Sequence, residues 1–248
     1  MSGHSKWSTI KRKKGAADTQ RSKLWGKLLR FVEVAARGGG SIEANPTLAT
    51  AVQKAKEASV PNDNIERAIK RGTGAIQGES FEEASYEGYA PAGVAVLVHC
   101  LTNNRNRTAQ DVRSVFNGHG GKMAEPGAVA WMFEGKGVVI VTKDAGDEDE
   151  VFLVAADAGA EDVRSSEETI EVITPPESTV AVRGALEQAG AKVESSDITQ
   201  VPKTTIELGE EDAKKVLRLI DALEDLDDVQ DVYANFDIPD DVLARQIA

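Results

Sequence analysis

The sequence predicts an α+β protein in which an N-terminal helical domain is followed by two α+β domains, the middle one ferredoxin-like and inserted into the other. Residues 1–75 show helical periodicity alone. From Gly78 onward, strand patterns alternate with helical ones, and one run has the order β-α-β-β-α-β that is typical of ferredoxin-like domains. At 248 residues, 41% of them hydrophobic, the chain is long enough for one to three domains with separate cores.

Three amphipathic helices are expected in the N-terminal part. Asp18 is a candidate N-cap, and Gly38 stands where a helix end favours a left-handed residue, so the first helix runs between them. The second helix begins with the cap Asn45 and with Pro46 at its first position. The third helix covers residues 62–71. Three short helices of this kind can share one small core.

The first helix carries an apolar stripe beside a basic stripe. It therefore has one face to bury and one face to offer to phosphate groups. The apolar stripe consists of Leu24, Leu28, Phe31 and Ala35, and the basic stripe consists of Lys23, Lys27, Arg30 and Arg37.

The remaining chain is read as alternating strands and helices. Residues 154–163 resemble residues 185–193, and in both segments a helix ends at a glycine and passes into a strand. The expected strands are 94–101, 128–133, 138–141, 169–173, 203–208 and 229–236, and two further helices are expected at 108–116 and 212–223. The expected domains are therefore a basic helical domain with its arm (1–77), a discontinuous α+β domain (78–134 plus 203–248) and an inserted ferredoxin-like domain (135–202).

Charge is distributed unevenly along the chain, and this is the main clue to function. The net charge is -12, yet the first 37 residues contain ten Lys or Arg against two Asp or Glu, a balance of +8. Like charges at this density repel one another, so nucleic acid is the expected partner. The alternative is a solvated basic tail that only aids solubility. The candidate nucleic-acid-binding residues of this segment are Lys6, Trp7, Lys11, Arg12, Lys13, Lys14, Arg21, Lys23, Lys27 and Arg30.

The basic run at residues 11–14 favours an N-terminal arm. Gly15 follows it directly, which suggests a flexible segment that contacts phosphates without reading base sequence. Trp7 could stack on an unpaired base or could be a packing residue, and the sequence leaves both open. Trp25 lies near the apolar stripe and is expected in the core.

A second candidate site is the loop at residues 102–108, between an expected strand and an expected helix. Arg105, Arg107 and the N-cap candidate Thr108 would bring guanidinium groups and free backbone N–H groups to one helix N-terminus, which is a natural anion site. The alternative is an ordinary polar loop in which Thr108 caps the helix. His119 could meet a phosphate or could be an exposed loop residue.

Other classes of function find little support in the sequence. The P-loop, H-E-x-x-H and EF-hand motifs do not occur, so we expect a protein without catalysis, metal or cofactor. Cys100 is the only cysteine, which excludes intrachain disulfides and suits a reducing cytosol. No apolar run has the length of a membrane span, and the basic N-terminus lacks the apolar region of a secretory signal.

Long motifs resemble the YebC/PmpR family of probable transcriptional regulators, whose mitochondrial relatives are translational activators of cytochrome c oxidase. The first motif is SGHSKWSTIKRKKGAADTQRSKLWGKLLRFVEVAARGGG at residues 2–40. The others are VPNDNIERAIKRGTG at 60–74, YEGYAPAGVAVLVHCLTNNRNRTAQDVRSVFNGHGGKM at 86–123 and WMFEGKG at 131–137. The resemblance implies a three-domain α+β protein, cytoplasmic in bacteria, that regulates gene expression without known catalysis.

Together these observations predict a non-enzymatic, nucleic-acid-binding regulator of gene expression. The resemblance favours a DNA-binding transcriptional regulator. A translational activator that binds ribosomal RNA stays open, because no helix-turn-helix signature is convincing. A pure protein-interaction scaffold would leave the basic arm unexplained. We expect the helical domain and its arm to hold the nucleic-acid backbone, and the acidic α+β domains to position it or to recruit protein partners.

Overall fold

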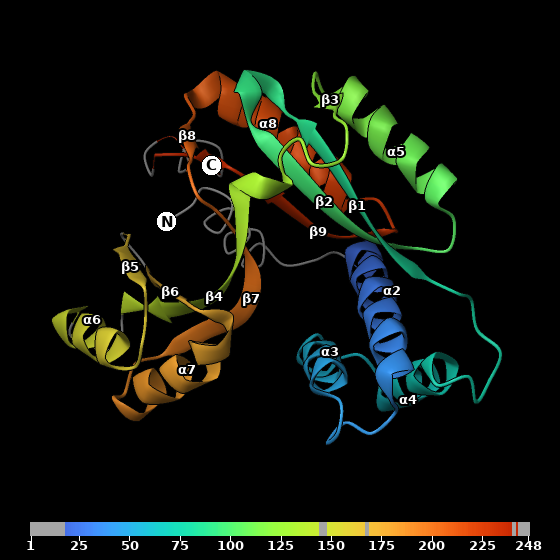
Figure 1. Ribbon diagram of the computed structural model, residues 1–248, viewed down its shortest axis with the longest axis horizontal. Coiled ribbons are helices and arrows are strands. Elements are labelled where there is room, and N and C mark those ends of the chain that lie inside the picture. The colour runs from blue at the N-terminus through green and yellow to red at the C-terminus, as the bar shows by residue number, and fades with distance from the viewer. Residues whose placement is uncertain (1–17, 144–147, 167–168, 240–241, 243–248) are drawn as a thin grey trace. The chain divides into compact units, whose positions relative to one another are not determined.

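The computed structural model describes residues 18–143, 148–166, 169–239 and 242 (Figure 1). The chain divides into two compact units. One unit comprises the described part of Thr9–Val129 together with Glu210–Val232, and it contains the N-terminal helices and a four-stranded sheet. The other unit comprises the described parts of Ala130–Gly209 and of the chain from Tyr233 onward, and it contains a second four-stranded sheet.

The N-terminal part consists of the three predicted helices, α2 (Asp18–Ala35), α3 (Pro46–Glu57) and α4 (Asn62–Gly72). Their apolar faces share one core, in which every buried member lies between Val32 and Ala68. The predicted cap of the second helix is confirmed, because the Asn45 side chain accepts the Leu48 N–H at 3.1 Å. α4 packs so closely on α2 that a Cβ on Gly72 would lie 2.1 Å from the Glu33 carbonyl oxygen.

The first helix ends earlier than predicted and buries a somewhat different face. α2 stops at Ala35, a 3-10 turn covers Ala36–Gly38, and the residue with positive φ is Gly39 (133°), so the prediction for Gly38 was wrong by one position. Leu24 was expected on the buried stripe but is 45% exposed. The reason is that the buried face of α2 passes through Val32 instead.

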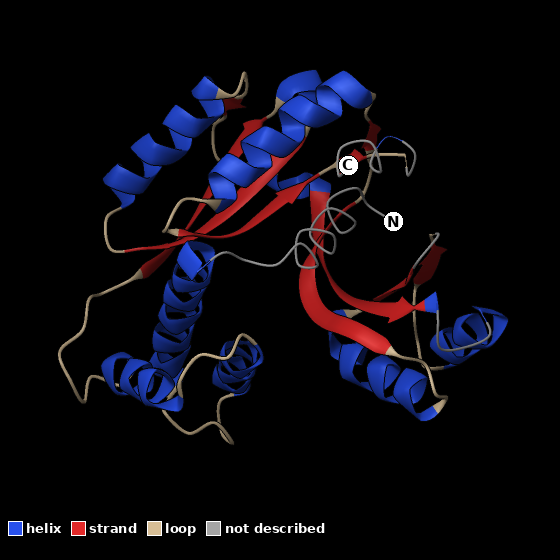
Figure 2. Cartoon of the chain, turned by 180° about the vertical axis from the view of Figure 1, so that it is seen from behind, coloured by secondary structure: helices blue, strands red, loops and turns tan. Residues whose placement is uncertain are grey.

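The sheet of the first unit has the strand order β3-β1-β2-β9. The neighbours β2 and β9 are far apart in the sequence, so the chain returns to this sheet after the ferredoxin-like domain, as predicted. Two helices, α5 and α8, pack on the sheet, where Phe116 and Leu219 are fully buried (Figure 2). The elements are β1 (Glu82–Tyr89), β2 (Ala95–Thr102), α5 (Arg105–Gly118), β3 (Lys122–Met123), α8 (Glu210–Glu224) and β9 (Val229–Ala234), with a 3-10 turn at Pro91–Gly93.

The second unit contains the predicted β-α-β-β-α-β domain. Its sheet has the order β5-β6-β4-β7 with antiparallel neighbours throughout, which is the ferredoxin-like arrangement. One face of the sheet packs on both helices through a core that includes Val172, Val182 and Leu186. The elements are β4 (Phe133–Thr142), α6 (Glu148–Asp157), β5 (Asp162–Ser165), β6 (Thr169–Thr174), α7 (Thr179–Gln188) and β7 (Val193–Pro202), with a 3-10 turn at Pro176–Ser178.

Two predicted strands were wrong. Residues 128–132 do not form a strand, and only Phe133 belongs to one (β4). The buried Glu87 carboxylate accepts the N–H groups of Gly127 and Val129, both at 2.6 Å, and so fixes a turn there. A 3-10 turn (Ala130–Met132) follows. Within 203–208 only β8 (Ile206–Glu207) is a strand, and it pairs in parallel with β10 (Phe236–Asp237) in a separate two-stranded sheet.

The two compact units do not follow the three expected domains. The first unit holds both the helical part and the four-stranded sheet, so the domain boundaries at 77, 134 and 202 stay a prediction. Within the described ranges, none of the helices combines the length and the apolar character that crossing a bilayer requires.

Candidate nucleic-acid interface

The twelve predicted nucleic-acid-binding residues fall into two groups. Six of them belong to the arm and lie outside the described residues: Lys6, Trp7, Lys11, Arg12, Lys13 and Lys14. The other six lie in the unit that contains α2: Arg21, Lys23, Lys27, Arg30, Arg105 and Arg107. Arg21 is exposed, whereas the other five donate hydrogen bonds within the chain. No finding tests their contact with nucleic acid, so that assignment stays a prediction.

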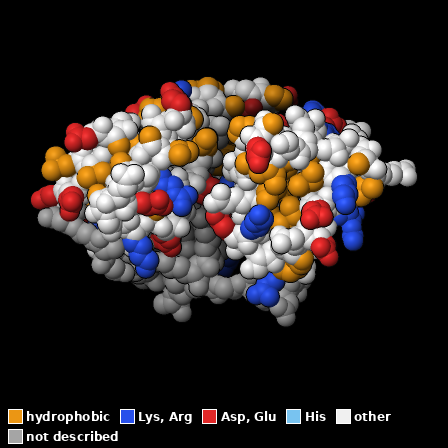
Figure 3. Space-filling model, turned by 90° about the horizontal axis from the view of Figure 1, so that it is seen from below, with side chains coloured by type: hydrophobic (Ala, Val, Ile, Leu, Met, Phe, Trp, Pro, Cys, Tyr) orange, Lys and Arg blue, Asp and Glu red, His pale blue; other side chains and the backbone are white. Residues whose placement is uncertain are grey.

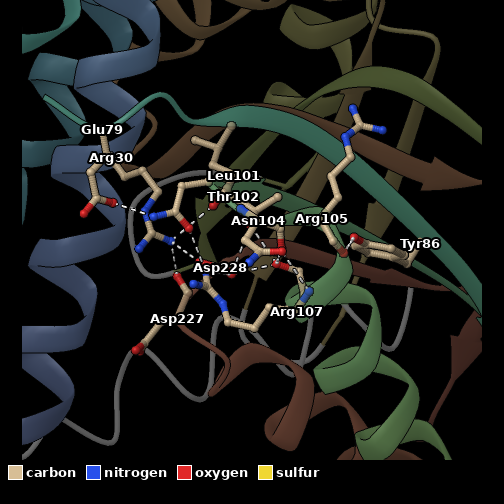
Figure 4. Close-up of polar contacts among 12 residues, drawn as sticks. Arg30, Glu79, Tyr86, Leu101, Thr102, Asn104, Arg105, Arg107, Asp227 and Asp228 are labelled. Atoms are coloured by element: carbon tan, nitrogen blue, oxygen red, sulfur yellow. Dashed lines mark hydrogen bonds and ion pairs between the residues drawn. The ribbon is translucent and has the colours of Figure 1, made fainter.

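The basic stripe of α2 contacts a short acidic segment that begins at the last residue of α8 and ends just before β9. This segment, residues 224–228 with the sequence EDLDD, is called the acidic turn below. Three cations of α2 donate to its backbone carbonyl groups (Arg30 with Asp227 in Figure 4). The hydrogen bonds run from Lys23 Nζ to Asp225 O (3.4 Å), from Lys27 Nζ to Glu224 O (2.5 Å) and from Arg30 Nη1 to Asp227 O (2.6 Å).

Helix polarity explains why this segment attracts cations. The last carbonyl groups of α8 lack partners within the helix, and the helix dipole adds partial negative charge at that end. Lys27 therefore acts as a cap for α8, although it belongs to another helix. Burial lowers the pKa of Lys27, and the nearby carboxylates, Glu224 first among them, oppose that shift. Arg30 also lies 4.7 Å from the centre of the Phe81 ring, a cation–π contact.

Asp228 is the most highly connected carboxylate of this region (Figure 4). Its side chain is 9% exposed. Burial would raise its pKa, but hydrogen bonds from Arg107 and Thr108, together with the charges of Arg107 and Arg30, outweigh burial, and the pKa of Asp228 is lowered. Oδ1 accepts from Arg30 Nη1 (3.1 Å), and Oδ2 accepts from Arg107 Nη2 (2.6 Å), Thr108 Oγ1 (2.7 Å) and Thr102 Oγ1 (3.2 Å).

The loop at 102–108 holds an anion, as its sequence suggested, but the residue that caps the following helix is not the predicted one. Asn104 caps α5 by accepting the Arg107 N–H at 3.1 Å, so the prediction that Thr108 is the N-cap was wrong. Thr108 lies inside the helix and is buried, because its hydroxyl donates to Asp228. The anion found at this helix N-terminus is the chain's own Asp228 carboxylate.

Arg105 points away from this cluster (Figure 4). Its side chain is 58% exposed, its Nε lies 2.8 Å from the Glu82 carboxylate, and its Nη2 donates to the Glu83 carbonyl group at 2.7 Å. The two arginines of the loop therefore differ. Arg107 is tied to a nearly buried carboxylate, whereas Arg105 lies on the surface.

Trp25 and Arg37 have structural partners. The Trp25 indole packs against the helical core and donates to the Ala58 carbonyl group at 2.9 Å, as expected for a core residue. Arg37 donates to the Phe81 carbonyl group. Both residues therefore help to hold the helical part in place.

Sequence reasoning missed two features of this region. The first is the acidic turn itself, although four acids within five residues are a visible signal. The second is a set of exposed cations on α3 and α4, comprising Lys56, Arg67 and Lys70. The face seen in Figure 3, which has the helical part on its right, shows Lys and Arg side chains beside an exposed hydrophobic area.

Two observations on the described residues concern metal binding and thiol chemistry. Within those ranges, no three His, Cys, Asp or Glu side chains converge as metal ligands would. Burial raises the pKa of the Cys100 thiol to about 12, so this thiol stays protonated at neutral pH and is a poor nucleophile.

Comparison with known proteins places the chain among proteins of matching length. A probable transcriptional regulatory protein of Rubrobacter xylanophilus is 56% identical over 99% of this chain and 99% of its own length. A protein of the same description from Syntrophobacter fumaroxidans is 53% identical over the same shares. The crystal structure of a conserved hypothetical protein from Aquifex aeolicus is similar with a TM-score of 0.79 and 49% identity, over 90% of this chain and 93% of that one.

Two family models match the chain in succession. The model of the TACO1/YebC N-terminal domain matches residues 5–75, which include the arm and the three N-terminal helices. The model of the second and third TACO1/YebC domains matches residues 81–236, which include both four-stranded sheets. The chain therefore belongs to the TACO1/YebC family.

Proposed function

We propose that this protein is a non-enzymatic regulator of gene expression that acts in the cytoplasm by binding nucleic acid, with DNA and transcription as the first candidate. The observation that carries the proposal is the balance of +8 in the first 37 residues of a chain whose net charge is -12. The relatives described as probable transcriptional regulatory proteins support the regulatory part.

The proposed contacts are mainly electrostatic. The arm residues Lys11–Lys14 and the exposed Arg21 would pair with phosphate groups, which set position and affinity without reading bases. Of the two loop arginines, Arg105 is proposed to reach phosphate more readily, because its partner Glu82 is exposed, whereas Arg107 is tied to the nearly buried Asp228. The acidic α+β domains would position the complex or recruit protein partners.

Ribosomal RNA is the second candidate target, and with it a role in translation. The observation that favours it is the arrangement of α2. Lys27 and Arg30, in the middle of its basic stripe, bind the acidic turn, whereas a recognition helix would present such residues to a major groove. Contacts restricted to phosphate suit a structured RNA as well as duplex DNA.

Ultraviolet crosslinking of the full chain in growing cells, followed by sequencing of the attached nucleic acid, tests the proposal. Enrichment of promoter fragments supports transcription, and enrichment of ribosomal RNA supports the second candidate. A variant with Lys11, Arg12, Lys13 and Lys14 changed to alanine serves as the control, because it should recover less nucleic acid of either kind. Recovery of neither kind by the natural chain contradicts the proposal.

A further inference from the structure

The contact between α2 and the acidic turn is polar, whereas the packing of α2 on the other two N-terminal helices is based on an apolar core. Every buried member of the helical core, and every partly buried residue packed on it, lies between Trp25 and Ile69. The helices therefore complete their apolar core without the sheet. What joins α2 to the acidic turn is a set of cations bound to carbonyl and carboxylate oxygens.

The acidic turn offers these cations the same chemistry as a phosphate backbone. Its oxygens receive hydrogen bonds from Lys and Arg side chains in one row along α2, and Arg107 of α5 adds a fourth cation. Phosphate oxygens accept from lysine and arginine in the same way. Four of the predicted nucleic-acid-binding residues are thus already occupied by an anionic segment of the chain.

We propose that the acidic turn is an internal competitor of nucleic acid, and that phosphate groups displace it from Lys23, Lys27, Arg30 and Arg107 when a strand binds along α2. This inference rests on the proposed function, and it concerns the regulation of the same site. α2 separates from the acidic turn on binding, and the free protein holds its cationic face closed.

The exposure of the four cations sets the order of displacement. The side chains of Lys23 and Arg107 are 43% and 48% exposed, so an incoming phosphate reaches them first. The Arg30 side chain is 18% exposed, and it becomes accessible only after the outer contacts have changed partners. At Arg30 and Arg107, phosphate takes the place of the Asp228 carboxylate. At Lys23 and Lys27, it takes the place of backbone carbonyl groups as hydrogen-bond acceptor. The acidic turn itself stays attached to the sheet of the first unit, because the flanking Leu223 and Val229 are fully buried.

Closure of this kind favours ligands with several phosphates in a row. A single phosphate can exchange with one outer contact, but it leaves the other cations bound to the acidic turn. A polyanion replaces all the contacts together, and its affinity for the open state shifts the population from closed to open. Because only open molecules bind all the phosphates, the apparent affinity of the protein is the affinity of the open state multiplied by the fraction of molecules that are open.

Carboxyl labelling of the full chain provides the test. Carbodiimide and glycinamide modify accessible carboxyl groups, and mass spectrometry locates the modified residues. A short DNA duplex and, separately, a fragment of ribosomal RNA are the probes. Because carboxylates do not bind phosphate, opening should expose Asp228 and raise its labelling several-fold when either probe saturates the protein. Glu87 is the internal control, since its carboxylate is buried in the same unit by backbone N–H groups, and its labelling should not change.

A matched pair of variants gives a second readout. Asp225→Asn removes the carboxylate that lies 3.9 Å from Lys23, whereas Glu211→Gln removes one exposed carboxylate near the other end of α8. Both changes remove one negative charge, so the two variants have the same net charge. Competition predicts that Asp225→Asn strengthens probe binding several-fold more than Glu211→Gln does.

The outcomes separate this inference from the proposed function. If a probe binds, Asp228 labelling stays constant and the two variants gain affinity equally, the inference is overturned while the proposed function stands. If the natural chain binds neither probe, the proposed function fails, and the inference fails with it.

Discussion

At the scale of single residues, Asp228 connects three separate parts of the chain. Its carboxylate accepts from Arg30 of α2, from Arg107 and Thr108 of α5, and from Thr102 at the end of β2. A nearly buried charge that is fully hydrogen-bonded in this way is costly to disturb, because removing it leaves its donors without an acceptor. Asp228 therefore holds the helical part to the sheet.

Replacing Asp228 tests this role. Asp228→Asn should lower the free energy of unfolding at neutral pH by about 2–4 kcal/mol, because a neutral amide cannot satisfy two guanidinium groups. Arg105→Ala is the matched control at the same helix terminus. It breaks an exposed ion pair with Glu82 and an exposed hydrogen bond to the Glu83 carbonyl group, so it should cost less than about 1 kcal/mol. Urea unfolding of the three proteins measures both values, and equal losses would contradict the assignment.

The pH dependence of the same variant is a separate prediction. The pKa of Asp228 is lower in the folded state than in the unfolded state. Its stabilising contribution is therefore fully present above the unfolded pKa and is lost as the pH falls through the folded pKa. The stability gap between the natural chain and Asp228→Asn should shrink on acidification. Urea unfolding over a series of acid pH values measures the gap, and a constant gap would argue against the lowered pKa.

The sequence showed which side chains of this region are charged, but not which groups they contact within the chain. The basic stripe of α2 and the anion-binding character of the loop at 102–108 were both visible. Their anion was not, because Arg30 and Asp228 are 198 positions apart and only the folded sheet brings them together. Arg105 pairs with an exposed carboxylate and Arg107 with a nearly buried one, and this difference likewise depends on which carboxylates the fold brings beside α5.

At the scale of secondary-structure elements, local signals predicted most of the structure. Apolar periodicity and caps located α3 and α4, and the repeated helix–glycine–strand pattern predicted the order of the ferredoxin-like domain. Two strand predictions failed for non-local reasons. All of the expected strand at 128–133 except Phe133 is irregular, because Glu87, about 40 positions away, accepts the N–H groups of Gly127 and Val129. The strand that carries Glu87, β1, was not predicted.

The packing of α4 on α2 gives a prediction at this scale. Gly72→Ala should destabilise the protein by about 1–3 kcal/mol, because its Cβ would overlap the Glu33 carbonyl oxygen. Gly26→Ala is the control in the interior of α2, where nothing lies within 4 Å of the added Cβ. It should stabilise the helix by about 0.5–1 kcal/mol. Thermal unfolding distinguishes the two, and a neutral Gly72→Ala would show that the helices can move apart without cost.

At the scale of the whole molecule, only one of the two four-stranded sheets needs the C-terminal segment of the chain to be complete. β9 pairs with β2, and α8 buries Leu219, Ile220 and Leu223 on the same unit. The ferredoxin-like sheet is complete by Pro202. Removal of the chain after that point should therefore affect one sheet much more than the other.

Amide hydrogen exchange of a chain ending at Pro202 tests this dependence. Protection of β2 should be lost, because its neighbour β9 and the covering helix α8 are gone. Protection of β4 and β6 should persist. The full chain, with protection in both sheets, is the reference. Persistent protection of β2 in the shortened chain would show that the first sheet does not need the C-terminal segment.

The salt dependence of nucleic-acid affinity tests the central claim most directly. Binding of the full chain to duplex DNA is measured over a range of salt concentrations, beside a variant with Lys11, Arg12, Lys13 and Lys14 changed to alanine. If the arm binds phosphates, the log–log slope of the variant should be shallower by about 0.9 for each phosphate that it no longer neutralises, with affinity reduced alike for all sequences. Thermal unfolding should show the same midpoint for both proteins. An unchanged slope in a folded variant would contradict the account.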